Sequence, residues 1–446
     1  MKELISKNFG LFIQDKITGT NIEKKYIELK KTQNYNNKET YSYQLEKLKK
    51  LLINAYENIN FYKKIMDENN LNPYNLISLD ELNKLPIIDK SILQKNNIRN
   101  INIKKVKIVK TGGTTGIPLK IIKDSNVRSY TWAAYYRWYS WMGIEFGDKV
   151  ISLWGTPTTL KSSIRKKVYI KLSNYLTNNY EINTFEMNQE NIEEIIAFLK
   201  KEKPKLLRGY LSSLLFVANY ILKNNIKLCI PNISSTTATL FPHDREKLKK
   251  AFNGEVFDQY GCSEATSIAF ECSKHSGLHI TNERVIIEVV DKNGNRVYDE
   301  PGEIVITDLD NYAMPIIRYK NGDMAIMSTS PCSCGIKSPM LRKIIGRTID
   351  TIQLKNGENV PGWFFTNIFY ELKYPHELMK INRFQCYQEK KNYLVLKLET
   401  SENIDKEFLV DLKNSLNYFI DNINIECLEK IPNEASGKFR YIKSEI

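Results

Sequence analysis

The chain has 446 residues, of which 42% are hydrophobic and 11% aromatic; this is too long for one simple core and predicts two or three domains. Its formal net charge of +14 comes mainly from lysines spread along the chain, without an RNA-binding or zinc-finger signature, so we do not expect nucleic acid as a partner. No apolar run reaches the roughly 18 residues of a membrane span, the N-terminus lacks a signal-peptide core, and the seven cysteines do not suggest a disulfide framework. We therefore expect a cytoplasmic protein without membrane insertion.

The start of the chain is predicted to be helical. Residues 1–40 end in a polar segment rich in Asn and Lys, which we expect to be a loosely held N-terminal extension. The next segment carries apolar residues at steps of three and four, the spacing of an amphipathic helix: Leu45, Leu48, Leu52, Ala55 and Ile59. Short helical pieces broken by Pro73 and Pro86 follow.

From Val106 onward, strand-like apolar runs alternate with helical patterns, which predicts a mostly parallel sheet with covering helices. Between about 266 and 345 the pattern becomes strand, Asn-Gly turn, strand, typical of antiparallel hairpins. The last hundred residues predict a hairpin, a strand, a helix from about 405 to 419 and a final strand. We expect an α/β fold with a large domain at 41–346, including this β-rich subdomain, and a small α+β domain at 347–446.

A stretch rich in glycine and threonine, KTGGTTGIPLK, follows the strand-like run VKIV. Backbone N–H groups of such a turn, with the hydroxyls of Thr111, Thr114 and Thr115, can bind phosphate. The lysine that a Walker-type loop places directly after its last glycine is absent, because Ile117 and Pro118 stand there. Since PLKIIKD resumes as a strand, an ordinary hairpin turn explains the segment equally well.

The stretch VFDQYGCSEA ends an apolar strand in a glycine and a carboxylate, at the kind of strand-to-loop junction where ligands bind in α/β sheets. Tyr260 could stack on a base, and Glu264 could hold Mg²⁺ together with phosphate oxygens. The alternative is that Ser263 caps a helix and the glutamate is an exposed surface residue.

Three later stretches carry further candidates. In PIIRYKNGDMAIM, Asp323 follows a glycine at an expected turn, where it could bind ribose hydroxyls or be an ordinary turn aspartate. IIGRTID places Arg347 at the expected domain boundary, and EASGKFRYIK places Lys438 near the C-terminus. Alone, such a lysine is normally a solvated surface residue.

The order of these motifs is more specific than any one of them. TGGTTG, YGCSE, RYKNGD, GRTID and SGKFR, at these intervals, resemble the adenylate-forming (acyl-activating) enzyme superfamily. The resemblance is greatest to the phenylacetate–coenzyme A ligase branch and its relatives in capsule polysaccharide biosynthesis. LLINAYENINFYKKIM, LPIIDKSIL and LRGYLSSLLFVANYI are similar to the helical N-terminal part of that branch, so the resemblance runs from about Tyr41 to the C-terminus.

The resemblance implies a set of ATP-binding residues, in which Tyr260 would pack against adenine and Asp323 would bind the ribose: Thr111, Gly112, Gly113, Thr114, Thr115, Gly116, Asp258, Tyr260, Gly261, Asp323 and Arg347. The catalytic set would be Thr115, Glu264 with its Mg²⁺, and Lys438. Lys438 would reach the cleft when a mobile C-terminal domain rotates about a hinge at Arg347 and Asp350, and would bridge the substrate carboxylate and the α-phosphate. The cation missing from the loop would therefore come from the other domain.

Two positions depart from the family pattern. Ile349 precedes Asp350 where the family commonly has an acidic pair, so the pivoting residue stays open. The segment TTATLFP lacks the Gly-Glu or Ala-Glu pair that relatives often carry, so adenine contacts from this loop cannot be carried over.

Three cysteines and a histidine in ECSKHSGLHI and PCSCG offer ligands suited to tetrahedral Zn²⁺: Cys272, His279, Cys332 and Cys334. Some relatives in this branch look similar at these positions. The ion would be structural because no coordination position stays open. His275 is a competing ligand, and reduced cysteines without a metal are the alternative. Three other cysteines lie in apolar or alternating contexts and are expected in the core: Cys229, Cys386 and Cys427.

The implied activity is ATP-dependent activation of a small carboxylic acid as acyl-adenylate with release of pyrophosphate. The acyl group would then pass to a thiol, either coenzyme A or the phosphopantetheine arm of a carrier protein. An amine acceptor in surface polysaccharide biosynthesis, or a non-catalytic nucleotide-binding scaffold, are the alternatives. One bulky aromatic set could wall an acyl pocket, although its spacing also fits a helix buried in the core: Trp132, Tyr135, Tyr136, Trp138 and Trp141.

Overall fold

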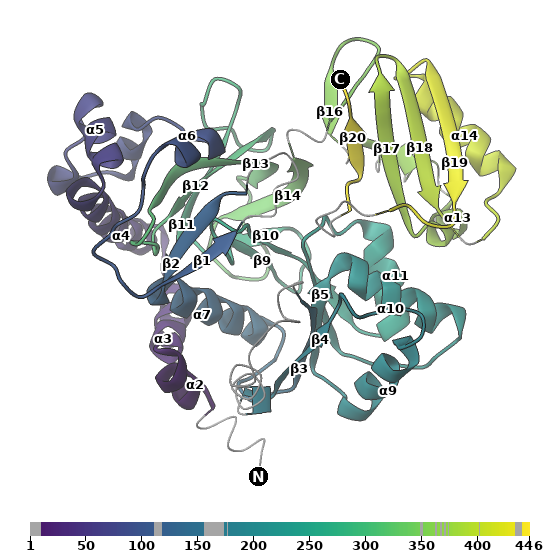
Figure 1. Ribbon diagram of the computed structural model, residues 1–446, viewed down its shortest axis with the longest axis horizontal. Coiled ribbons are helices and arrows are strands. Elements are labelled where there is room, and N and C mark those ends of the chain that lie inside the picture. The colour runs from purple at the N-terminus through teal and green to yellow at the C-terminus, as the bar shows by residue number, and fades with distance from the viewer. Residues whose placement is uncertain are drawn as a thin grey trace.

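The described residues of the computed structural model form four parts: a mainly helical N-terminal region, a parallel sheet with covering helices, an antiparallel sheet and a C-terminal region (Figure 1). It describes residues 10–110, 118–155, 174–175, 177–347, 351–361, 364–365, 368–369, 372, 374–400, 402–432 and 439–446. None of the helices in these ranges is both long enough and apolar enough to cross a membrane.

The N-terminal region consists of helices and one hairpin: α2 (Leu11–Thr18), α3 (Ile22–Thr32), α4 (Asn37–Asn58), α5 (Asn60–Glu68), η2 (Pro73–Asn75), η3 (Leu79–Lys84), α6 (Lys90–Lys95), β1 (Val106–Lys110), β2 (Lys120–Asp124) and α7 (Ser125–Trp141). α4 begins at a capping box formed by Asn36 and Glu39. α3 packs on α7 through the fully buried Ile22 and Leu29. Residues 1–40 therefore contain two packed helices, in contrast to the loosely held segment expected from their polar composition.

The second region is a five-stranded parallel sheet in the order β4-β3-β5-β6-β7. Helices α9, α10 and α11 cover one face, and α7 packs against the other. Apolar strands alternate with amphipathic helices along the chain, which explains this arrangement. The elements are β3 (Val150–Trp154), β4 (Asn179–Asn183), α9 (Ile192–Glu202), β5 (Leu206–Tyr210), α10 (Leu211–Lys223), β6 (Asn232–Thr236), α11 (Pro242–Phe252) and β7 (Glu255–Phe257).

A seven-stranded antiparallel sheet in the order β11-β12-β13-β14-β10-β9-β8 follows: β8 (Gln259–Tyr260), β9 (Ala269–Glu271), β10 (Leu278–Ile280), β11 (Val285–Val290), β12 (Pro301–Asp308), β13 (Ile316–Ser328) and β14 (Met340–Arg347). The Asn-Gly hairpin is confirmed as β11 and β12. Asp323, expected at a turn, lies instead within β13, opposite Arg347. The strand continues because a β-bulge accommodates the glycine, with Gly322 at a φ of +81°.

The C-terminal region contains a hairpin and a four-stranded sheet in the order β19-β18-β17-β20. Its elements are β15 (Thr351–Gln353), β16 (Asn359–Pro361), α13 (Pro375–Lys380), β17 (Arg383–Lys390), β18 (Tyr393–Glu399), α14 (Lys406–Asn417), β19 (Asn422–Leu428) and β20 (Ile442–Ser444). It docks on α11, where Lys247 Nζ donates to the Ile381 carbonyl at 3.2 Å. Phe241 packs into the C-terminal core with its ring centroid 5.2 Å from that of Tyr441.

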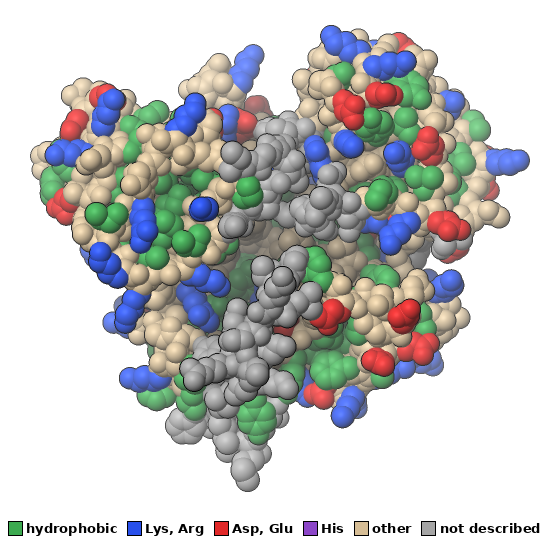
Figure 2. All heavy atoms as spheres, in the orientation of Figure 1, with side chains coloured by type: hydrophobic (Ala, Val, Ile, Leu, Met, Phe, Trp, Pro, Cys, Tyr) green, Lys and Arg blue, Asp and Glu red, His purple; other side chains and the backbone are tan. Residues whose placement is uncertain are grey.

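The α/β fold with a parallel sheet, covering helices and a C-terminal α+β region is confirmed, and the β-rich part is larger than expected. Of the three cysteines expected in the core, Cys386 is buried, whereas Cys229 and Cys427 are exposed. Their apolar neighbours misled the prediction, since strand and loop residues beside a core residue can still face solvent. On the face in Figure 2, Lys and Arg side chains are spread over all regions without one large basic patch.

A candidate nucleotide site and a cysteine–histidine cluster

Tyr260, Asp323 and Arg347, which come from three separate motifs, meet at one point between β8, β13 and β14. The Tyr260 hydroxyl donates to Asp323 Oδ2 at 2.8 Å, and Arg347 Nε lies 3.3 Å from Asp323 Oδ1. Asn321 Nδ2 donates to both Tyr260 Oη and Asp323 Oδ2 at 2.8 Å. Burial raises the pKa of Asp323, opposed by the Arg347 charge and the Tyr260 hydroxyl. These contacts hold the Asp323 carboxylate in one orientation.

Glu264 lies close to this cluster and is buried. The Tyr319 hydroxyl donates to Glu264 Oε1 at 3.1 Å. Lys123 on β2 lies within electrostatic range, and burial lowers the pKa of its ammonium group, opposed by Asp308, Cys262 and Glu264. A buried glutamate within electrostatic range of a partly desolvated cation is suited to bind a charged ligand.

The turn between Tyr260 and Glu264 favours a glycine at Gly261. A side chain there would place its Cβ 3.0 Å from the backbone nitrogen of Ser267. The turn is closed by Cys262, whose backbone N–H donates to the Ala265 carbonyl at 2.9 Å. This close approach fixes where Glu264 leaves the strand.

Asp258 faces a different group of charges. Its backbone N–H donates to Glu271 Oε2 at 2.8 Å, and Glu271 forms an ion pair with Arg245 at 2.9 Å. Desolvation, together with the Glu271 charge, raises the pKa of Asp258 to about 8. The structure therefore does not bring the Asp258 side chain into the Tyr260–Asp323 cluster.

Several predicted residues lie outside the described residues: Thr111, Gly112, Gly113, Thr114, Thr115, Gly116, Asp350 and Lys438. The two strands beside the threonine-rich stretch are described. β1 and β2 pair antiparallel, with Lys110 opposite Lys120.

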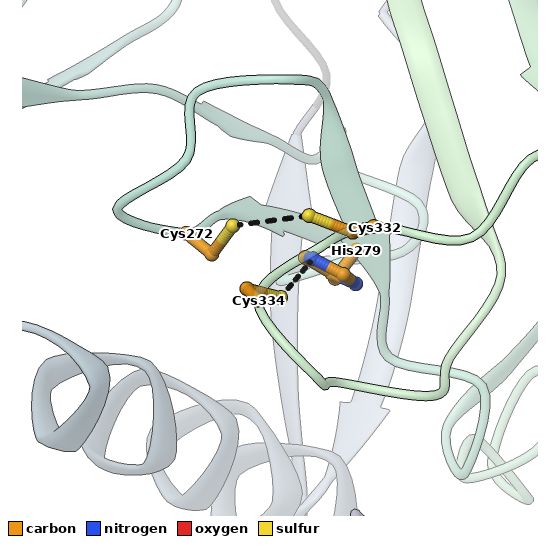
Figure 3. Close-up of side chains that lie close together, drawn as sticks. All are labelled: Cys272, His279, Cys332 and Cys334. Atoms are coloured by element: carbon orange, nitrogen blue, oxygen red, sulfur yellow. Dashed lines mark hydrogen bonds between the residues drawn. The ribbon is translucent and has the colours of Figure 1, made fainter.

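The cysteine–histidine cluster is formed by Cys272 after β9, His279 on β10, and Cys332 and Cys334 from the connection between β13 and β14 (Figure 3). Their four ligand atoms lie within 4.8 Å of one another. Cys272 Sγ is 3.7 Å from Cys332 Sγ, and Cys334 Sγ is 3.2 Å from His279 Nε2. Sulfurs bound to one tetrahedral Zn²⁺ at about 2.3 Å are separated by roughly 3.7 Å, so the donors fit this ion.

The protonation of this cluster depends on a cation. Burial, with a contribution from the neighbouring thiols, raises the pKa of Cys272 to about 12, so its thiol stays protonated at neutral pH unless a metal ion displaces the proton. Burial lowers the pKa of His279, which favours the neutral imidazole that binds metals. His275, the competing ligand, lies instead 3.2 Å from Glu271 and 3.4 Å from Glu255.

Sequence reasoning missed Tyr319 and Asn321, which hold Glu264 and Asp323. A signal was present, because Tyr319, Asn321 and Asp323 are spaced by two, the repeat that puts strand side chains on one face. Reading KNGD as a turn hid this alternation.

Comparison with known proteins gives matches over most of the chain. Residues 353–445 match the family model of the CapK C-terminal domain. Protein CapK of Staphylococcus aureus is 27% identical over 430 residues, which covers 94% of this chain and 92% of CapK. Phenylacetate-coenzyme A ligase of Thermus thermophilus is 22% identical over 347 residues, which covers 71% of this chain and 72% of the ligase. The chain is homologous to CapK and to the phenylacetate-coenzyme A ligases.

The homology confirms the branch that the ordered motifs indicated. Among solved structures, 2-hydroxyisobutyryl-CoA ligase in its postadenylation state superposes with a TM-score of 0.74 at 17% identity, covering 92% of this chain and 91% of the ligase. The same ligase in its thioesterification state gives a TM-score of 0.60. The chain therefore has the fold of this ligase.

Proposed function

We propose that this protein activates a carboxylic acid with ATP, forming an acyl-adenylate and pyrophosphate, and then transfers the acyl group to a thiol of coenzyme A or of a carrier-protein phosphopantetheine. The main support is the convergence of Tyr260, Asp323 and Arg347 in a chain homologous to ligases. These three residues come from separate motifs, and together they form a donor–acceptor set suited to ribose and phosphate.

In this proposal Asp323 binds the ribose hydroxyls, Tyr260 orients Asp323 and packs beside the base, and Arg347 contacts ribose or phosphate. Glu264 fits the Mg²⁺ that such chemistry uses, because it is a buried carboxylate with one oxygen held by Tyr319. When bound, that ion neutralises phosphate charge. Attack of a carboxylate on an anionic phosphate is limited by repulsion, so positioning and charge stabilisation are what the chain has to supply.

Lys438 and the threonines of the phosphate loop complete the proposal. Lys438 bridges the substrate carboxylate and the α-phosphate, and Thr111–Gly116 bind the triphosphate, with Thr115 in the catalytic set. The C-terminal domain starts at Arg347 and rotates about Arg347 and Asp350. The docking contacts of α11, Lys247 with Ile381 and Phe241 with Tyr441, are the ones that such a rotation has to break.

The cysteine–histidine cluster belongs to the proposal as a structural Zn²⁺ site held by Cys272, His279, Cys332 and Cys334. Its role is to tie the β13–β14 connection to β9 and β10. A bound ion would then stabilise the pairing of β10 with β9 and β14, in the sheet that also carries Asp323. The ion would have four protein ligands, which leaves no position for a substrate.

The test is ATP–pyrophosphate exchange by the whole protein with aryl, fatty, hydroxy and amino acids, followed by AMP release with coenzyme A, a phosphopantetheinyl carrier or an amine as acceptor. Acid-dependent exchange supports activation, and the acceptor that accelerates AMP release identifies the second step. An amine is included among the acceptors because amide formation in surface polysaccharide biosynthesis is the alternative second step. ATP binding without exchange across the panel would favour the non-catalytic scaffold.

A further inference from the structure

Four arginines are buried in the described part of the chain, and one of them differs from the others. Arg137 pairs with Glu283 at 2.5 Å, Arg284 with Asp310 at 2.8 Å and Arg318 with Glu288 at 3.1 Å. Arg208 is 7% exposed and forms no ion pair with any described carboxylate. Because a buried charge without a counter-ion is costly, this arginine requires an explanation.

Arg208 lies on β5, in the centre of the parallel sheet, and is surrounded by aromatic rings. Its guanidinium carbon is 4.8 Å from the ring centroid of Tyr135, 5.0 Å from that of Trp154 and 5.8 Å from that of Trp132. Nη1 donates to the Tyr139 hydroxyl at 2.7 Å, and Nε has no partner. Aromatic faces stabilise a cation by about 0.5–2 kcal/mol each but do not neutralise it.

Glu181 on β4 is within electrostatic range of Arg208, because the Arg208 charge opposes the effect of burial on the pKa of Glu181, but the two side chains form no ion pair. Glu181 pairs with Ser152, and Ser152 with Arg208, so Glu181 is two strands away, roughly 10 Å between Cα atoms. Glu181 is also exposed to solvent. On the other side, Arg208 neighbours Ser234, which is neutral. The row across the sheet therefore contains one unpaired guanidinium between two hydroxyl groups.

The position of Arg208 relative to the nucleotide cluster suits a substrate contact. α7 forms a common wall, since Thr131 Oγ1 lies 2.7 Å from Thr266 Oγ1, two residues beyond Glu264. Tyr135, which faces Arg208, is one turn further along α7, roughly 6 Å along the helix axis. From the other direction, Gln259, next to Tyr260, donates to Ser234 Oγ at 3.2 Å. Arg208 is therefore connected to the turn that carries Glu264 through α7 on one side and through Ser234 and Gln259 on the other.

We propose that Arg208 binds a second carboxylate of the acid that is activated, so that the substrates are dicarboxylic acids whose far end lies against Trp132, Tyr135 and Trp154. The proposal rests on the acid-activating function above and names its substrate class. A guanidinium presents parallel N–H donors that match a carboxylate, and aromatic walls accept the apolar body between the two acid groups. The substrate then provides the counter-ion that the described residues do not supply.

The test compares dicarboxylates with their monomethyl esters in ATP–pyrophosphate exchange. Succinate, glutarate, adipate and benzenedicarboxylates are paired with the half-esters, which keep the body and remove the second charge. We expect kcat/KM to be about 10- to 100-fold higher for the diacid, the range for a hydrogen bond to a charged group. Half-esters accepted as well as the diacids would overturn the proposal.

Variants Arg208→Met and Arg208→Lys separate substrate binding from folding. In Arg208→Met we expect KM for the diacid to rise about 10- to 100-fold, kcat/KM for the half-ester to stay within about threefold, and the thermal midpoint to be unchanged. Arg208→Lys keeps the positive charge but lacks the two parallel N–H donors of a guanidinium, so its KM for the diacid should lie between those of the wild type and Arg208→Met. Equal losses for diacid and half-ester would show a structural role and overturn the proposal.

A binding measurement separates this proposal from the proposed function. Trp132 and Trp154 flank Arg208, so a diacid should change tryptophan fluorescence saturably in the wild type but not in Arg208→Met. If no acid supports exchange, the activation function fails, and the titration still decides the anion site. Saturable quenching lost in Arg208→Met supports the site, and no saturable change in the wild type overturns it.

Discussion

Arg284 and Arg208 are both buried arginines, but within the part of the chain that the structure describes, Arg284 forms an ion pair and Arg208 does not. Arg284 is fully buried; its Nε donates to Asp310 at 2.8 Å and Nη1 to the Thr266 carbonyl at 2.6 Å. Asp310 also accepts from Lys47 of α4. Arg208, among aromatic rings, has only a hydroxyl as acceptor for Nη1. The comparison indicates that Arg284 holds the fold together, whereas Arg208 is available to a ligand.

The same distinction separates other groups in the molecule. Asp323 is held by Tyr260, Asn321 and Arg347 before any ligand arrives, so its orientation is preorganised. The cysteine–histidine cluster shows the opposite charge relationship to Arg208. Its four ligand atoms lie together and would need a bound cation, whereas Arg208 would need a bound anion. Each of the following predictions tests one side of this distinction, from the largest expected effect to the smallest.

Removing Arg284 should cause the largest loss of stability. Arg284→Met leaves Asp310 buried beside Lys47 without its main partner, so we expect the free energy of unfolding to fall by about 3–5 kcal/mol. Urea unfolding of this variant and of Arg208→Met measures the difference. A similar effect of the two substitutions would remove the distinction between the two arginines.

Lys438 is a third cation for this comparison, and we expect it to affect the reaction rate but not the stability of the fold. We expect Lys438→Ala to lower exchange by about 10²- to 10³-fold while leaving the thermal midpoint unchanged, because the charge acts on the developing transition state. Pyrophosphate exchange and a thermal melt on one preparation give both values. Exchange within a few-fold of the wild type would contradict the role of Lys438.

Removing one cluster ligand should weaken metal binding. For Cys334→Ser we expect at least about 10- to 100-fold weaker zinc affinity than the wild type, since even outer-shell losses have this effect. Competition with a zinc chelator followed by elemental analysis measures it. His275→Ala is the matched control and should keep one equivalent, because its ring contacts Glu255 and Glu271. Less than one equivalent in wild type prepared without chelator would argue against the site.

The smallest expected effect is a pH dependence next to Arg284. Burial raises the pKa of Asp308 to about 6, opposed by Arg284 and supported by Asp310. Because the folded state keeps this proton longer than the unfolded state, Asp308 should lower stability as pH rises from about 4 to about 6. In Asp308→Asn, which keeps the oxygen that accepts from the Asp310 backbone N–H, this decline should disappear. An unchanged pH profile of urea midpoints would contradict the assignment.

Much of the fold was predictable because strand and helix patterns are local. The Asn-Gly hairpin from Val285 to Asp308 and the helix beginning after Asp405 follow from turn residues and apolar spacing. The clustering of Cys272, His279, Cys332 and Cys334 was also predictable, because three cysteines and a histidine are the residue types that bind a tetrahedral zinc ion.

Other features depend on tertiary contacts and were not readable in advance. The RYKNGD motif makes Asp323 a candidate, but the position of Asp323 within a bulged strand follows from pairing with β12 and β14. Arg208 in KLLRGY carries no local sign that it is buried without a counter-ion, since this depends on the stacking of α7 on the sheet. The exposure of Cys229 and Cys427 is likewise set by which face the neighbouring elements cover.

Phe241 precedes α11 but packs in the C-terminal core, stacked on His243 and against Phe384 and Tyr441. Separating the two parts would return this phenyl ring to water, at a cost of about 2 kcal/mol. The resting arrangement therefore has a built-in energetic bias. A ligand that separates the C-terminal region from α11 must therefore bind the separated form more tightly by more than this free energy. A smaller side chain at position 241 would lower that requirement.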